Sequence, residues 1–127
     1  MTARELTKAA YAVIGLINEN GEPSGDTDDL SARALNLINI LLAENAELDC
    51  RIRRTEHTVK SIGTLEDELD LCEIVSNGVM PYGLAFMLTL GEDDSLAEAL
   101  RVRYAEARKN ALKFGKAKAE PITEVYR

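Results

Sequence analysis

The sequence predicts a mainly α-helical fold: a four-helix bundle-like single domain over residues 1–115, a short extended or hairpin excursion between the second and third helices, and an extended C-terminal tail over 116–127. Three observations predict it. Apolar residues recur three and four positions apart along most of the chain, which is the period of a helix buried on one face. Turn-forming residues divide the chain at only a few places. With two Phe, four Tyr and no Trp among 127 residues, the core must be aliphatic, which suits packed helices.

The first two helices are predicted from their apolar stripes and their ends. The first covers about 2–18, with Thr2 as its N-terminal cap and an Asn-Gly pair as its stop. A turn-rich loop over 21–26 follows. The second helix runs from residue 28 or 29 to about 48, and its apolar stripe is wide enough to predict contacts on two sides.

The helical period fades between residues 49 and 71. β-Branched residues over 52–59 show no helical face and favour an extended excursion, for which a short hairpin and an edge strand are two open forms. Gly63 predicts a turn. The stretch 64–71, Thr-Leu-Glu-Asp-Glu-Leu-Asp-Leu, is expected to form an acidic loop that its three leucines anchor.

The third helix is predicted over 72–90 with an interruption. Pro81 lies inside it and removes a backbone donor, so we expect a kink or a break near Gly78. The bare Cα of Gly83 would let another helix approach closely. The run 79–90 is apolar on nearly every side, which leaves two interpretations open: core or an oligomer interface. At a dozen residues it is too short to span a bilayer, so no membrane is expected.

The fourth helix is predicted over 95–114, with Gly115 as its stop. Seven basic residues and one acidic residue lie within 101–118, whereas residues 1–100 hold 19 acidic and 7 basic residues. The basic helix has three open interpretations: a solvated face, a contact with an acidic protein surface, or a contact with nucleic acid. In the tail, residues 121–126 are apolar enough to add as a strand to a partner.

We expect no enzyme, cofactor or metal site. The only histidine, His57, is expected to be exposed, and its sequence neighbours do not form a nucleophilic triad. The acidic residues over 66–73 lack the ligand spacing of a calcium loop and are expected to form a solvated surface. Cys50 and Cys72 match no metal spacing and are expected to be free thiols in a reducing compartment, the cytoplasm.

The order of several motifs resembles that of a known family. These are Ala-Leu-Asn-Leu-Ile-Asn-Ile-Leu-Leu-Ala-Glu over 34–44, Leu-Glu-Asp-Glu-Leu-Asp-Leu over 65–71, Met-Pro-Tyr-Gly-Leu-Ala over 80–85, Gly-Glu-Asp-Asp over 91–94 and a basic helix containing Tyr104. In this order, over about 3–115, the chain is similar to the head–tail connector (adaptor, or head-completion) proteins of tailed bacteriophages and of prophages. Their motifs are packing and turn signatures and not catalytic ones.

The resemblance implies a structural subunit of the virion, present in the host cytoplasm during assembly. It would form a ring of copies beneath the portal, with twelvefold symmetry as one arrangement, either alone or only on the portal. The ring would extend the DNA channel without sequence-specific binding and dock a tail or stopper protein. The predicted interface residues are Pro81, Tyr82, Phe86, Arg101, Arg108, Lys109, Ile122, Val125 and Tyr126. The alternative is a small helical binding or regulatory module that contacts a protein or nucleic acid through residues 95–114.

Overall fold

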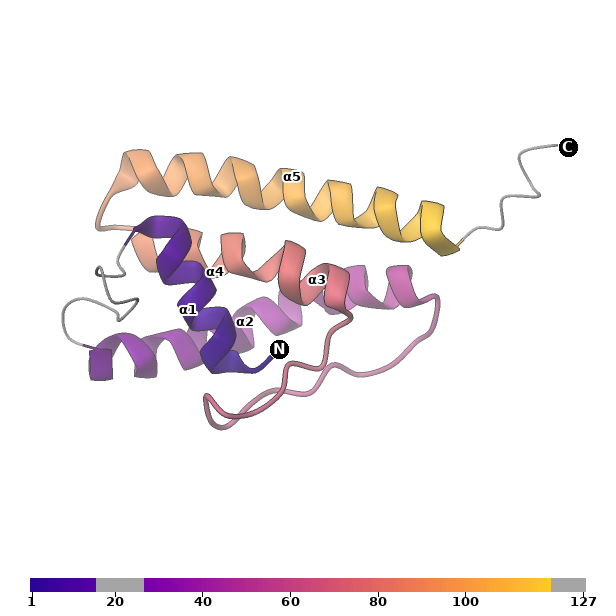
Figure 1. Ribbon diagram of the computed structural model, residues 1–127, viewed down its shortest axis with the longest axis horizontal. Coiled ribbons are helices and arrows are strands. Elements are labelled where there is room, and N and C mark those ends of the chain that lie inside the picture. Colours follow the sequence, from indigo (N-terminus) through magenta and orange to yellow (C-terminus); the bar gives the residue numbers. More distant parts are fainter. Residues whose placement is uncertain (16–26, 120–127) are drawn as a thin grey trace, which may run out of the picture.

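The computed structural model describes residues 1–15 and 27–119, and side chains within 1–15 and 32–114. The described residues form a mainly helical domain, as predicted (Figure 1). No strand occurs among them, and a single β-bridge joins Thr2 to Glu68. The helices are α1 (Ala3–Ile14), α2 (Thr27–Arg53), α3 (Glu73–Gly78), α4 (Met80–Thr89) and α5 (Asp94–Ala119).

The two long helices, α2 and α5, run in the same direction, and α3 and α4 return between them (Figure 1). Helix α4 packs against all four other helices. Met80, Leu84 and Ala85 are fully buried, and Pro81 is buried too. The apolar run 79–90 is therefore mostly part of the hydrophobic core. Pro81, one of the predicted interface residues, is buried among the other helices.

The break in the third predicted helix is confirmed. Helix α3 ends at Gly78 and α4 begins at Met80, so Pro81 lies in the first turn of α4. A proline is tolerated there because the first turn of a helix needs no backbone N–H donor. The close approach at Gly83 is confirmed as well. A Cβ on Gly83 would lie 2.8 Å from Cε1 of Tyr104 and 2.9 Å from Cδ2 of Leu41, so α2, α4 and α5 meet at this glycine.

Three predicted helix ends were wrong. Helix α1 stops at Ile14, because Gly15 adopts a left-handed conformation (φ 75°) and caps it. Helix α2 continues past residue 48 to Arg53, since buried Asp49 and Ile52 extend its inward face. Helix α5 continues through Gly115 to Ala119, so residues 116–119 are helix and not tail. A glycine inside a helix costs only about 1 kcal/mol and does not end it by itself. The rest of the predicted tail, 120–127, lies outside the described residues.

The segment 54–72 crosses from α2 to α3 without the hairpin or edge strand that was one expectation. Hydrogen bonds to its backbone hold it in place. The side-chain amide of Asn39 donates to the Ile62 carbonyl (2.9 Å) and accepts from the Ile62 N–H (2.8 Å). The start of the chain also pairs with it, because the N–H groups of Ala3 and Arg4 donate to the carbonyls of residues 67 and 65. The predicted leucine anchors at 65, 69 and 71 are half-buried or buried.

Candidate functional site

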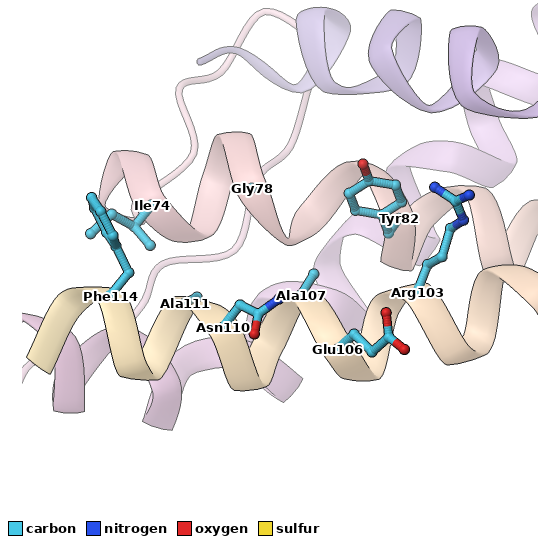
Figure 2. Close-up of a pocket in the computed structure, with 9 residues that line it drawn as sticks. All are labelled: Ile74, Gly78, Tyr82, Arg103, Glu106, Ala107, Asn110, Ala111 and Phe114. Atoms are coloured by element: carbon cyan, nitrogen blue, oxygen red, sulfur yellow. The ribbon is translucent and has the colours of Figure 1, made fainter.

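A surface groove of about 440 Å³ lies between α5 on one side and α3 with α4 on the other (Figure 2). Its middle is lined by small residues, Gly78, Ala107 and Ala111. Gly78, the last residue of α3, has no side chain, so α3 fills little of the space that faces α5 at this point. The groove exists because these helices meet here without large side chains to fill the space between them.

Larger side chains lie at the two ends of the groove (Figure 2). Ile74 and Phe114 lie at one end, and Phe114 is 59% exposed. Tyr82 lies at the other end, together with one basic residue, Arg103, and one acidic residue, Glu106. An apolar floor with aromatic residues and a charged rim is typical of a surface that binds a protein segment. We call this surface the α3–α5 groove.

Of the predicted interface residues within the described ranges, the structure brings only Tyr82 into the α3–α5 groove. Tyr82 lines it, whereas Phe86 is half-buried against the core and does not. Ile122, Val125 and Tyr126 lie outside the described residues. Sequence reasoning did not identify the rest of the lining. The chain shows that Ala107 and Ala111 are small, but only the structure shows that Gly78 lines the groove with them.

The three predicted basic residues do not form one site. Arg108 and Lys109 line a second hollow, of about 260 Å³, together with Arg51 of α2. The guanidinium of Arg108 also lies 5.8 Å from the centre of the Tyr104 ring, at cation–π distance. Arg101 instead pairs with Glu98 one turn earlier in α5, and this contact lowers the pKa of the Glu98 carboxyl. Because that pair is exposed, it adds little to stability.

A buried polar network joins α2 to α5 next to Gly83. The side-chain amide of Asn45, which is fully buried, donates to the Tyr104 hydroxyl (2.8 Å) and to the Leu41 carbonyl (3.0 Å). The Tyr104 hydroxyl donates to the carboxylate of Glu44. Burial, together with this hydrogen bond, raises the pKa of Tyr104 well above its ordinary value. Tyr104 is therefore a neutral donor that fixes how α5 sits on α2.

A second polar cluster surrounds Asp49, whose side chain is 0% exposed. Its Oδ1 accepts from the Cys72 backbone N–H (2.7 Å) and from Nε of Arg53 (3.2 Å). Its Oδ2 lies 2.8 Å from Nε2 of His57. The expectation of an exposed histidine was wrong, because the His57 side chain is only 22% exposed and lies against this carboxylate. Residues from both ends of the 54–72 segment therefore meet one buried charge on α2.

The cluster places a cysteine beside the histidine. Sγ of Cys50 lies 3.6 Å from Nδ1 of His57 and donates to the His57 carbonyl (3.4 Å). Both cysteines are free thiols, as expected. Burial is the main cause that raises the pKa of the Cys72 thiol, and the carboxylate of Asp49 raises it further. The thiol therefore stays protonated and weakly nucleophilic at neutral pH. These contacts fasten the segment to α2.

Two further findings bear on what the described residues can do. Among residues 1–15 and 27–119, no group of three or more His, Cys, Asp or Glu side chains is arranged to hold a metal ion. Over the same residues, no helix combines the length and the apolar character that crossing a membrane requires.

Comparison with known proteins returned no match, whether the chain was compared with family models, with curated proteins or with solved structures.

Proposed function

We propose that this protein is a structural, non-enzymatic subunit of a phage head–tail connector, which works by binding other protein subunits. One observation carries the proposal: three of the motifs that resemble connector proteins contact each other in the fold. Gly83, from the Met-Pro-Tyr-Gly-Leu-Ala motif, packs on Tyr104 of the basic helix. Leu41, from the motif over 34–44, packs on the same glycine. The resemblance thus lies partly in residues that determine packing.

The charge distribution supports association of copies in a head-to-tail manner. Acidic residues gather at the turn into α5, which contains Glu92, Asp93 and Asp94. Basic residues gather towards the other end of the molecule, where α2 and α5 both finish (Figure 1). Unlike ends attract when copies stack in one direction, and a contact of this kind closes into a ring when the rotation between copies allows it.

In this proposal the α3–α5 groove is a docking surface for a neighbouring copy, the portal protein or a tail protein. DNA would pass through the assembled ring without sequence-specific contacts. The protein would be found in virions, and in the host cytoplasm before assembly.

The test is the solution mass by light scattering over a range of concentrations, with and without a candidate portal protein. We expect a defined oligomer, formed alone or on the portal. Asn110→Arg places a charged side chain in the α3–α5 groove and should weaken assembly at least tenfold. Ala105→Arg adds the same charge at an exposed position of α5 outside the groove lining and should leave assembly unchanged. A monomer under both conditions would contradict the proposal.

A second candidate function is contact with nucleic acid through α5. It is favoured by the hollow that brings Arg51, Arg108 and Lys109 together. Binding of this kind would weaken steeply with salt, because it depends on released counterions. A DNA titration at low salt, repeated with Lys109→Glu, would show a loss of binding in the variant. No binding of the unchanged protein at low salt would exclude this function.

A further inference from the structure

A thiol, an imidazole and a carboxylate lie in a row at the end of α2. Sγ of Cys50 lies 3.6 Å from Nδ1 of His57, and Nε2 of the same ring lies 2.8 Å from Oδ2 of Asp49. Asp49 and Cys50 belong to α2, whereas His57 comes from the segment 54–72. An activated nucleophile needs this order of groups, with a base beside it and a carboxylate behind the base.

The position of Asp49 determines which nitrogen of His57 can accept a proton. A neutral imidazole keeps its hydrogen on Nε2, because the other tautomer would place a lone pair against the carboxylate oxygen. Nδ1 is then the acceptor, on the side of the Cys50 thiol. If the thiol proton moves to Nδ1, the imidazolium that forms faces a fully buried carboxylate, whose negative charge stabilises it.

The thiol of Cys50 is accessible to small molecules. Cys50 is only half-buried, and it lines a surface hollow of about 320 Å³ at the end of α2. The other residues that line this hollow are polar or charged: Glu47, Arg51, Arg54, Thr55 and Glu56. Two basic and two acidic side chains are among them, so the hollow favours neither sign of charge in a molecule that enters it.

Further charged groups surround the imidazole of His57. Arg53 of α2 contacts both oxygens of Asp49, so it shares that negative charge with His57. A second hollow, which His57 and Arg53 line together, contains three more charged residues, Lys60, Glu68 and Asp70. Basic and acidic side chains are again equal in number there. The carboxylate of Asp49 is therefore the charge in direct contact with the imidazole.

The second cysteine of the cluster provides a comparison. Cys72 is half-buried like Cys50, but its thiol lies against the carboxylate of Asp49. Burial, and then this carboxylate, raises the pKa of the Cys72 thiol. A thiol beside a carboxylate keeps its proton, whereas a thiol beside an imidazole can transfer it. The two thiols around Asp49 should therefore differ in reactivity.

We propose that Cys50 is a reactive thiol and a site of modification by small-molecule disulfides, with His57 as its general base. The proton of Cys50 moves to Nδ1 of His57 as Sγ attacks one sulfur of the disulfide. A bond forms between Sγ and that sulfur, the disulfide bond of the reagent breaks, and the released thiolate takes the proton from His57. The products are a mixed disulfide on Cys50 and one free thiol, so no further oxidant is needed. The site does not depend on the connector function.

The test uses the full-length chain and dithiodipyridine, a neutral disulfide whose released thiopyridone is measured by absorbance. Mass spectrometry of peptides identifies which cysteine carries the adduct. At neutral pH, Cys50 should react faster than Cys72 by about tenfold or more, since only Cys50 has a base beside it. Equal rates for the two cysteines, or a faster reaction of Cys72, would overturn the proposal.

The role of His57 is tested by His57→Gln, which removes the base. The reaction of Cys50 at neutral pH should slow by about tenfold or more, while that of Cys72 stays the same. Thr58→Gln introduces the same side chain at the next, exposed position and should change neither rate. If His57 only fastened the segment, its loss would expose both thiols and speed up both reactions. That result, or an unchanged rate at Cys50, would contradict the assignment of His57.

The pH dependence separates activation from exposure. Below the ordinary thiol pKa of about 8.5, a thiol without a base reacts about tenfold faster for each added pH unit. His57→Gln should follow this slope, and the unchanged protein a shallower one. Above about pH 9.5 the two should react alike, because an ordinary thiol is then mostly ionised. Asp49→Asn removes the charge behind the base, and its folded molecules should show an intermediate slope. Parallel profiles of the three proteins would overturn the proposal.

Discussion

The helix crossing around Gly83 and the segment 54–72 are both parts of the fold, but different forces hold them. At the crossing, α2, α4 and α5 bury aliphatic side chains and a tyrosine ring against a bare Cα. The segment 54–72 has few buried side chains, and polar side chains of α2 hold it through its backbone. The comparison teaches that a helical core is held by many small apolar contacts, whereas an irregular segment depends on a few specific hydrogen bonds.

This difference predicts that single polar changes will loosen the segment and that steric changes will disturb the crossing.

The largest effect is expected at Asp49. Asp49→Ala removes a buried carboxylate that contacts Arg53, His57 and the Cys72 backbone, and should lower the free energy of unfolding by about 3 kcal/mol. Urea unfolding measures it. The control Glu47→Ala breaks only the exposed pair with Arg51 and should change it by less than about 1 kcal/mol. Equal effects of the two changes would argue against a special role for Asp49.

The next largest effect is expected at the crossing. Gly83→Ala places a Cβ within 3 Å of the Tyr104 ring, which cannot easily move because Asn45 and Glu44 hold its hydroxyl. The resulting overpacking should destabilise the fold by about 2 kcal/mol.

Thermal unfolding of Gly83→Ala is compared with that of Gly78→Ala. A Cβ on Gly78 would meet no atom within 4 Å, and alanine favours helix, so this variant should be neutral or slightly stabilised. If both variants behaved alike, the close approach at Gly83 would not control stability.

A smaller, local effect is expected at Asn39. Asn39→Ala removes both hydrogen bonds to the Ile62 backbone and should cost about 1 kcal/mol. Amide hydrogen exchange shows which residues this loss of stability affects. Faster exchange should be confined to residues of the 54–72 segment, while α4 keeps its protection. Uniform acceleration across the helices would mean that the segment and the core unfold together.

The smallest expected effect is on the pH dependence of the free energy of unfolding in acid. Oδ2 of Asp67 accepts hydrogen bonds from the N–H groups of Gly63 (2.8 Å) and Thr64 (3.0 Å), which lowers the pKa of Asp67. The Asp67 carboxyl therefore binds a proton more readily in the unfolded chain than in the folded one. The stabilisation that these hydrogen bonds provide is complete above the ordinary aspartate pKa of about 4, and it is lost as the pH falls through the lowered pKa of Asp67.

Asp67→Asn should therefore make stability depend less steeply on pH below about 4, as urea unfolding at several pH values can measure. Glu56→Gln removes one exposed negative charge from the same segment and serves as the control. An unchanged slope in Asp67→Asn would show that these hydrogen bonds do not contribute in the folded protein.

The predictability of each region follows from the same physics. Helix α4 was identified, with its break near Gly78, because proline and glycine act locally and leave a mark in the sequence. The end of α2 was missed because its last turns bury Asp49, a polar residue that interrupts the apolar pattern. The α3–α5 groove was not anticipated, because the chain shows where small residues lie on a helix and not what faces them.

By itself, the sequence determined the mainly helical class, the break before α4 and the close approach at Gly83, because the period of apolar residues and the backbone limits of proline and glycine are properties of neighbouring residues. The tertiary structure alone decided that α2 and α5 run in the same direction, that His57 lies on a buried Asp49, and that a groove opens beside Phe114. Each of these depends on residues distant in the chain, whose contacts are fixed only when the whole core is packed.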